Sequence, residues 1–308
     1  MIKKLSIIII TATISIVATL PVASYAQSES VRHFNLSDKG ATVNVTVNDT
    51  AYDFLVDPSL RNIIMLSPNL VAANNVKESG VASLFPFSAD VDGRKLKGRT
   101  GKLRLDISDV GLIKTRAYWF EENTWAGTDG VLGASGFDED ELVFVSDKHQ
   151  GKSTLIARTF DLTSKKDWSV RTELNGLPVF VKFRPHYAHS RANMISTVAL
   201  KDRGLVKPTG TPVAIQREFA QKAYAQNAIP LETLSILGAK YSEIVIQDTE
   251  ANITPSVTDV DEVIAQASKK KKSKGPAPEF FLGQDYFEQC PKVVFNKKAK
   301  QVTTHCLR

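Results

Sequence analysis

An internal repeat is the feature that most restricts what this chain can fold into. Segments 48–59 and 175–186 align without a gap, and each holds a turn pair, an apolar strand, a charged residue and a proline. Self-similarity of this kind indicates one structural unit that occurs twice. The 308 residues would allow one large domain or two ordinary ones, and the repeat favours two similar parts.

Each copy of the repeat predicts a β-hairpin at its start. Asn48-Asp49 and Asn175-Gly176 are residue pairs typical of two-residue hairpin turns. The residues before the first turn alternate between apolar and polar, as in a half-buried strand (Val43, Val45 and Val47). We therefore expect a strand, a tight turn and a second strand in both halves.

The correspondence continues downstream of the hairpins. Ser67 and Pro68 predict the cap and first turn of a short helix, and residues 194–200 occupy the matching place in the second copy. An apolar pair then precedes Gly133 in the first copy and Gly283 in the second. Two further hairpins are predicted, one joining 142–145 to 154–156 and one joining 293–295 to 301–304.

Other segments also favour strands over helices. Apolar residues alternate in several places with the period of a strand (Leu103, Leu105, Ile107, Ile113, Leu234, Ile236, Ile244 and Ile246). Short helices are predicted at 217–226 and 260–267. The sequence thus predicts a mainly β protein.

The N-terminus has the pattern of a secretory signal peptide. Two lysines precede an apolar run, and Ser24-Tyr25-Ala26 is a small-x-small cleavage site. We expect residues 1–26 to be removed, and the mature chain to be exported to the periplasm or the extracellular space without a membrane span. The mature chain then divides into units at 27–170 and 171–308, the second with a lysine-rich solvated loop near 249–278.

Cys290 and Cys306 are the only cysteines, and export places them in an oxidising compartment. They flank the predicted C-terminal hairpin, whose two ends come together. We therefore expect a disulfide that clasps this hairpin. No third cysteine is present for a metal site.

The ordered motifs of the repeat resemble the aspartic proteases of the pepsin and retropepsin type. A strand that ends in Asp57, a Ser-Pro helix start and an apolar-apolar-Gly motif occur in that order, and they recur in the second half. The resemblance covers both halves, so it implies the two-lobed, pepsin-like acid protease fold with a β-barrel-like unit and short helices in each lobe. In that family, each lobe supplies one aspartate, and the two carboxylates share a proton.

The sequence departs from the family pattern at the residues that matter most. Asp57 matches the first catalytic position, but Pro58 replaces a hydroxyl residue and Ser59 replaces a glycine. Arg184, followed by Pro185 and His186 (the remaining candidate cleft residues), stands at the second aspartate position. A guanidinium remains protonated at physiological pH and cannot act as a base. We therefore expect an ion pair between Asp57 and Arg184, and a peptide- or protein-binding module without protease activity.

Two alternatives remain open. One is an atypical aspartic endopeptidase that uses Asp57 with a second carboxylate from elsewhere in the chain, for which Asp129 and Asp285 are the candidates, or from a second chain. The other is a structural envelope protein whose lysine-rich loop contacts an anionic surface. The segment expected to form the family's flap, 84–94, contains two phenylalanines but no tyrosine, which also favours an inactive site.

Other function classes have weaker support. His186 and His189 have a His-x-x-His spacing, but no carboxylate lies close in sequence, so no metal and no cofactor are expected. Glycines near 127–136 lack the Gly-Lys-Ser/Thr of a phosphate loop, and Ser135 lacks the final glycine of a hydrolase nucleophile motif. Nucleic acid is not indicated for an exported chain of modest charge. We expect a monomer that binds an extended peptide or another envelope protein.

Overall fold

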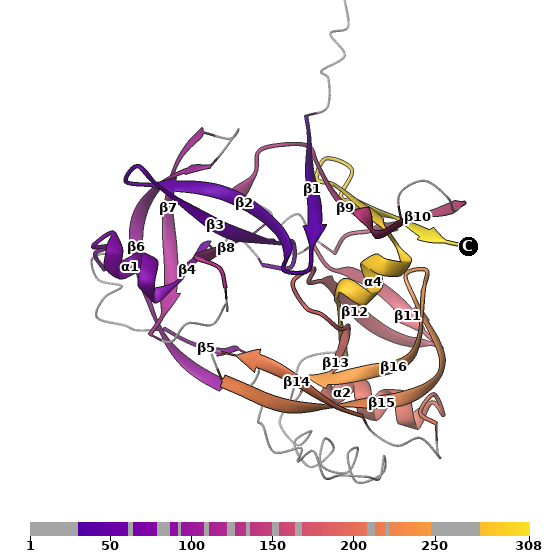
Figure 1. Cartoon of the computed structure of the whole chain (residues 1–308). Coiled ribbons are helices and arrows are strands. Elements are labelled where there is room, and N and C mark those ends of the chain that lie inside the picture. The colour runs from indigo at the N-terminus through magenta and orange to yellow at the C-terminus, as the bar shows by residue number, and fades with distance from the viewer. Residues whose placement is uncertain are drawn as a thin grey trace, which may run out of the picture.

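The computed structural model of the chain describes residues 30–60, 64–78, 87–91, 94–107, 111–121, 127–133, 136–149, 154–163, 168–207, 213–219, 222–247 and 278–308. The predicted signal peptide, the helix at 260–267 and almost all of the lysine-rich loop lie outside these residues. So do Ser135 and residues 84–86 and 92–93 of the predicted flap. The protein is mainly β, as predicted, and its strands form two sheets (Figure 1).

One set of seven strands comes from the N-terminal part of the chain, and we call it the first-half sheet. In spatial order it consists of β2 (Gly40–Val47), β3 (Thr50–Asp57), β8 (Gly130–Gly133), β4 (Ile64–Leu66), β7 (Gly111–Phe120), β6 (Arg94–Ile107) and β5 (Phe87–Val91). Strand β2 also pairs with β6, which curves this sheet toward a barrel. Helix α1 (Pro68–Ala73) follows β4.

The second-half sheet has seven strands in the corresponding order. They are β11 (Val170–Leu174), β12 (Leu177–Phe183), β17 (Glu279–Leu282), β13 (Arg191–Asn193), β16 (Ala239–Gln247), β15 (Lys222–Ile236) and β14 (Val213–Phe219). Helix α2 (Met194–Asp202) follows β13, as α1 follows β4.

The directions of the strands repeat as well as their order. Each sheet begins with an antiparallel hairpin, and the second hairpin strand then pairs in parallel with a short strand, β3 with β8 and β12 with β17. That short strand pairs antiparallel with β4 or β13, which in turn pairs in parallel with β7 or β16. The internal repeat of the sequence is therefore also a repeat of topology.

The local chemistry predicted for the repeat is present. Asn48 and Asp49 have φ values of 48° and 63°, and Asn175 and Gly176 have 48° and 74°, so both hairpins have the left-handed turn residues of a type I′ turn. The Ser67 hydroxyl caps α1 by accepting a hydrogen bond from the Leu70 amide at 3.2 Å. These matches confirm the two hairpins and the helix start.

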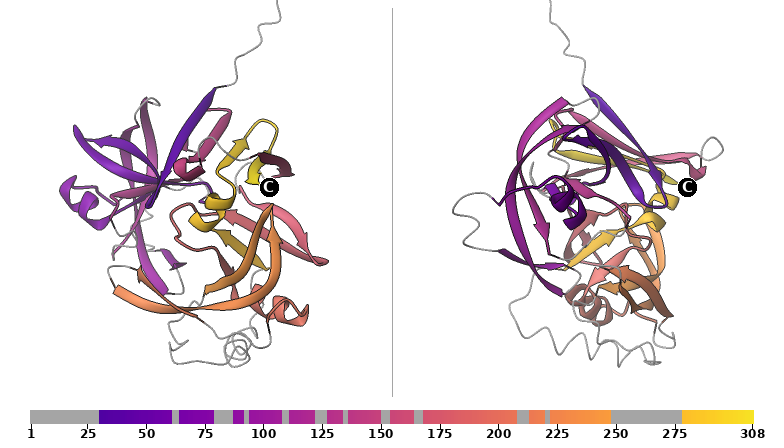
Figure 2. Two further views of the ribbon diagram at one scale, coloured as in Figure 1. Left: turned by 45° about the vertical axis from the view of Figure 1, so that its right-hand side comes forward. Right: turned by 60° about the vertical axis from the view of Figure 1, so that its left-hand side comes forward.

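A third group of strands, which we call the shared strands, contains segments of both halves. It extends the first-half sheet, because β1 pairs with β2. It contains β1 (Val31–Ser37), β9 (Glu141–Ser146), β18 (Lys292–Asn296), β19 (Gln301–Leu307) and β10 (Leu155–Asp161). Strand β9 pairs in parallel with β1 and antiparallel with β18, and β10 pairs with β19. These strands lie beside one another in space, in the part of the molecule that contains the C-terminus (Figures 1 and 2).

Two predictions about these elements are wrong. Strand β9 does not form a hairpin with β10, because both pair with strands of the second half. Residues 217–226 are not helical, since the residues described there belong to the β14–β15 hairpin. The C-terminal hairpin is confirmed, with β18 and β19 paired from Lys292–His305 to Asn296–Gln301. A 3-10 helix (Asp147–His149) and helix α4 (Gln284–Gln289) complete the described elements.

Candidate functional site

Asp57 is the last residue of β3 and lies opposite Gly133 of β8. The chain then makes a β-turn, because the Leu60 amide donates to the Asp57 carbonyl at 3.2 Å, and Pro58 occupies the second turn position, which suits its fixed φ. Asp57, Pro58 and Ser59 are all buried. The repeat thus brings the Asp57 carboxylate to the end of a core strand and out of contact with water.

Ser59 holds the Asp57 carboxylate in place. Its amide and its hydroxyl both donate to Asp57 Oδ1, at 2.8 and 2.7 Å. The resemblance requires a glycine at this position, and the serine instead supplies an additional hydrogen bond. A buried carboxylate that accepts two such bonds is partly compensated for its lost hydration.

Arg184 has the equivalent position in the second half. Its amide donates to the Leu282 carbonyl at 2.8 Å, which continues the β12–β17 ladder, and the Tyr187 amide donates back to the Arg184 carbonyl at 2.9 Å. Pro185 is the second residue of this turn, as Pro58 is in the first half. The same backbone turn therefore presents a carboxylate in one half and a guanidinium in the other.

The two turns meet. Arg184 Nε lies 3.7 Å from Asp57 Oδ2, and His186 Nδ1 lies 3.9 Å from the same oxygen. The side chains of Asp57, His186 and Arg184 are 0%, 7% and 19% exposed, so this cluster is nearly dry. The structure places Arg184 at ion-pair distance from Asp57, where the family would have a second carboxylate.

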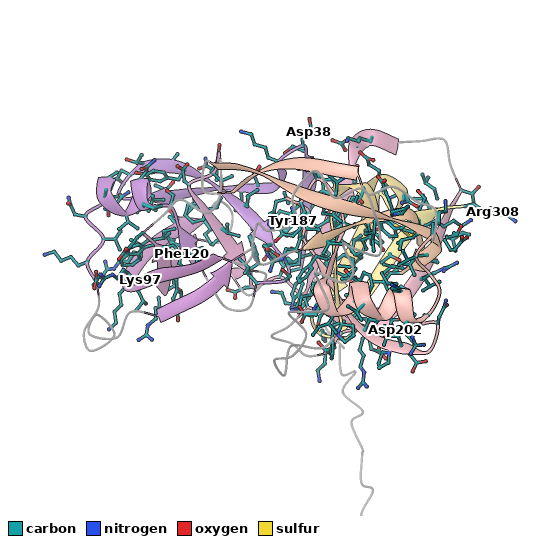
Figure 3. All side chains as sticks on the ribbon, turned by 90° about the horizontal axis from the view of Figure 1, so that it is seen from below. Asp38, Lys97, Phe120, Tyr187, Asp202 and Arg308 are labelled. Carbon is teal, nitrogen blue, oxygen red and sulfur yellow. A yellow bond between two sulfur atoms is a disulfide. The ribbon has the colours of Figure 1, made fainter. Side chains whose placement is uncertain are left out.

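Aromatic residues fix the guanidinium of Arg184. It donates to the Tyr187 hydroxyl at 3.0 Å and lies 5.4 Å above the Tyr187 ring and 5.3 Å above the Phe281 ring. Arg191 packs on Tyr187 at 3.6 Å. Figure 3 shows Tyr187 near the middle of the molecule, between the two halves. Contacts of this kind favour one orientation of the arginine.

The first half also covers the Arg184 turn. A Cβ placed on Gly40, which has φ +99°, would lie 3.0 Å from the backbone of His186 and 3.1 Å from that of Pro185. The side-chain amide of Gln284 donates to the carbonyl of Ser37 at 3.3 Å. The β1–β2 turn therefore packs closely on Pro185 and His186.

Neither candidate second carboxylate lies beside Asp57. Asp129 Oδ2 accepts a hydrogen bond from the Asp53 amide at 3.1 Å, four residues before Asp57 along β3, which corresponds to about 13 Å along the strand. Asp285 accepts hydrogen bonds from the amide and the hydroxyl of Ser190, at 2.8 and 2.6 Å. Both acids are engaged in other parts of the fold.

The cluster around Asp285 is a feature that sequence reasoning missed. The Ser190 hydroxyl accepts from the Gly283 amide at 2.9 Å and lies 3.1 Å from the Tyr241 hydroxyl. Burial raises the pKa of Asp285, and burial together with the Asp285 charge raises the pKa of Tyr241 well above its ordinary value. This network anchors Ser190, the residue before β13, to the start of α4.

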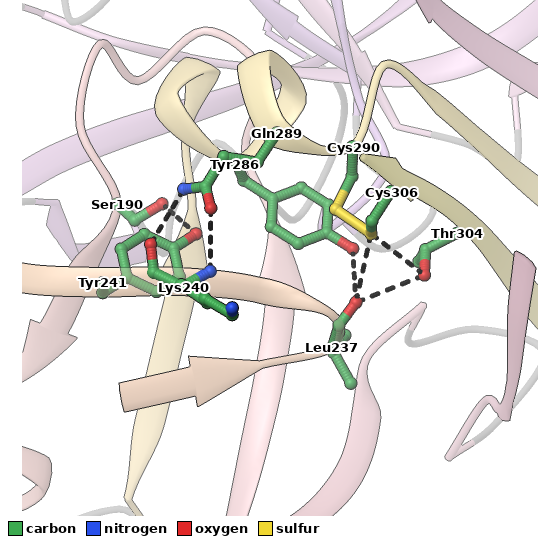
Figure 4. Close-up of a disulfide and its surroundings, with 9 residues drawn as sticks. All are labelled: Ser190, Leu237, Lys240, Tyr241, Tyr286, Gln289, Cys290, Thr304 and Cys306. Atoms are coloured by element: carbon green, nitrogen blue, oxygen red, sulfur yellow. Dashed lines mark hydrogen bonds between the residues drawn. A yellow bond between two sulfur atoms is a disulfide. The ribbon is translucent and has the colours of Figure 1, made fainter. Parts of the chain in front are cut away.

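The predicted disulfide joins Cys290 to Cys306 and connects the end of α4 to β19 (Figure 4). It packs on the β15–β16 turn, where a Cβ on Gly238 would meet the Cys306 sulfur at 2.8 Å. The Leu237 carbonyl in that turn accepts hydrogen bonds from Tyr286 and Thr304, at 3.1 and 3.2 Å. The disulfide therefore links three elements of the second half.

Over the part of the chain that the structure describes, no three His, Cys, Asp or Glu side chains are grouped closely enough to hold a metal ion. In the same residues, no helix has the length and apolar character needed to cross a membrane. His189 is exposed, whereas His186 faces Asp57, so the two histidines of the His-x-x-His spacing have different surroundings.

No protein-family model matches the chain, and no curated protein matches it significantly.

Proposed function

We propose that this protein is an exported, two-lobed pepsin-like protein that binds an extended peptide or protein segment without cleaving it. The observation that carries the proposal is the pair formed by Asp57 and Arg184 at equivalent turns, 3.7 Å apart. The repeated strand order of the two half-sheets supports the two-lobed arrangement.

The chemistry of this pair argues against peptide hydrolysis. Aspartic protease catalysis needs one carboxylate as base and one protonated carboxyl as hydrogen-bond donor. Arg184 cannot accept a proton from water, and its positive charge attracts the Asp57 carboxylate. In addition, Asp57 is fully buried and both of the hydrogen bonds to its Oδ1 come from Ser59.

The same residues are suited to binding. The Arg184 side chain retains 19% exposure, so part of it is accessible at the junction of the halves. A guanidinium held beside aromatic rings is suited to donate hydrogen bonds to the carbonyl groups or the terminal carboxylate of a peptide. Export is supported by the signal-peptide pattern and agrees with the disulfide.

A cleavage assay tests the catalytic half of the proposal. The mature chain is incubated with denatured casein across acid pH, with pepsin as the positive control, and fragments are followed by electrophoresis. We expect no cleavage. Hydrolysis that disappears in Asp57→Ala would overturn the proposal and favour the atypical endopeptidase.

A binding assay tests the other half. The probe is a fluorescein-labelled tryptic digest of casein, measured by anisotropy with the wild-type chain, Arg184→Met and the charge-retaining Arg184→Lys. We expect binding to weaken strongly in Arg184→Met and partly in Arg184→Lys. Equal binding by all three folded proteins contradicts a role for this site.

A further inference from the structure

Strands β6 and β7 carry an unusual arrangement of positive charge. In the antiparallel register Lys102 lies opposite Arg116, and Arg104 lies opposite Lys114. Residues two apart in a strand share a face, so these four positions form a grid on one side of the ribbon. Like charges directly opposite one another destabilise a sheet, which makes two adjacent pairs a cost to the fold.

Within the described part of the chain, three of the charges on this grid have no ion-pair partner. Lys102, Arg104 and Arg116 are exposed, and none of them forms an ion pair with a described residue. Arg99 on the same strand provides a contrast, since it lies 3.4 Å from both Glu78 and Glu121. Asp106 is the one acid two positions from Arg104, and it is exposed and makes no ion pair in the described part of the chain.

These cations line a hollow of about 710 Å³. Its other lining residues are Asn48 from the β2–β3 turn, Leu103 and Thr115. The Asn48 side chain is held by Asn74 at 3.1 Å, which fixes the turn at the rim. A volume of this order suits a compact ligand rather than a long polymer, because small-molecule sites have volumes of roughly 300–1,000 Å³.

We propose that this hollow binds a compact polyanion that carries at least two phosphate groups. Each phosphate monoester carries about −1.5 to −2 charges at neutral pH, so two of them balance the three lining cations. Two guanidinium groups offer the bidentate hydrogen bonds that phosphate oxygens accept. The ligand is either a free phosphate compound or a phosphorylated lipid headgroup, since both present the same chemistry.

The test uses the mature chain and two charge-matched triple variants. The first variant removes the three cations that line the hollow (Lys102→Gln, Arg104→Gln and Arg116→Gln), and we call it the groove variant. The control variant changes three exposed cations of the second half, Arg171→Gln, Lys240→Gln and Lys298→Gln. Inorganic tripolyphosphate is titrated by calorimetry, and vesicles with and without a phosphorylated anionic lipid are used in a sedimentation assay, all at fixed ionic strength.

We expect tripolyphosphate to bind the wild type and the control variant, and to bind the groove variant at least about tenfold more weakly, the loss of one charge-assisted contact or more. If only vesicles with the anionic lipid bind, with the same dependence on the groove, the ligand is a headgroup. Without ligand, the groove variant should be as stable as the wild type or more stable, because the repulsion across the ribbon is removed. Absence of binding to both probes, or equal loss in both variants, overturns the proposal, and the single variant Arg116→Gln repeats the test if the triple variant misfolds.

Discussion

The first-half and second-half sheets have the same strand order and directions, yet they differ in the side chains at equivalent places. Strand β3 ends in Asp57, and Arg184 directly follows the end of β12, so each begins an equivalent turn. Only the second half contains the disulfide, and only it has a carboxylate two residues after the glycine that follows the apolar pair. The shared topology brings the two equivalent turns together, whereas the residue at each turn, Asp57 or Arg184, determines the chemistry there.

The central pair shows this most clearly. Two carboxylates at this distance would repel each other and would need to share a proton. An acid and a guanidinium attract each other instead, so the junction of the two halves gains an electrostatic contact. The place where the family resemblance implies catalysis has become a point of attachment between the halves.

The largest expected effect comes from breaking that attachment. Arg184→Met leaves the buried Asp57 charge without its guanidinium partner, and we expect a loss of about 3–5 kcal/mol in the free energy of unfolding, as for other broken buried pairs. Urea unfolding measures it. Adding Asp57→Asn should recover part of the loss, with a coupling of about 1 kcal/mol or more. Strict additivity of the two changes would show that the pair contributes no attachment.

The disulfide gives the next largest difference between the halves. Replacing Cys290 and Cys306 by alanine opens a loop of 16 residues, for which the chain-entropy estimate is a loss of about 3 kcal/mol. The wild type in strong reductant serves as the control and should unfold at the same urea concentration as the double variant. If removal of the disulfide leaves the midpoint unchanged, the second half does not depend on its covalent link.

The two hairpin turns allow a smaller, reciprocal test. Asp49 and Gly176 occupy the same turn position with positive φ, which glycine adopts without steric cost. We expect Asp49→Gly to raise the free energy of unfolding by about 0.5–1 kcal/mol, and Gly176→Asp to lower it by a similar amount. Thermal unfolding checks both. A change of the same sign in both variants would contradict the equivalence of the turns.

The smallest expected effect is a pH dependence that arises from a carboxyl group of the second half. Burial raises the pKa of Asp285 above its ordinary value of 3.8, so the protonated carboxyl is favoured in the folded state. Its contribution is complete below that ordinary value and is lost as the pH rises through the folded pKa. Asp285→Asn does not titrate, so its stability relative to the wild type should increase from acid to neutral pH. Urea unfolding at several pH values measures this slope, and a slope of opposite sign would contradict it.

Much of the local structure followed from the sequence because it rests on local chemistry. Turn pairs, alternating valines and the Ser67 cap each act over a few residues, and the structure confirms them. The segment 217–226 misled the prediction because alanine, lysine and glutamine favour helices, whereas pairing of β14 with β15 overrides that preference. Strand β10 was assigned to the wrong partner because alternation identifies a strand but not its neighbour.

At the site, the alignment of the two copies is sufficient to predict that Asp57 and Arg184 form an ion pair. It did not reveal that Ser59 turns its hydroxyl onto Asp57, or that His186 faces the same oxygen. Nor did it reveal the contact between Ser190 and Asp285, which are 95 residues apart. Such contacts depend on how segments distant in sequence pack together. No short sequence motif indicates that packing.

The exchange of strands between the halves has a consequence for how the protein is made. Strands β9 and β10 belong to the first half, but their partners β18 and β19 lie between Lys292 and Leu307, far later in the sequence. While the chain is being synthesised, these two strands have open edges, and open edges favour pairing with other chains. Pairing with β18 and β19 therefore covers these edges, and a variant that lacks those two strands exposes both edges together.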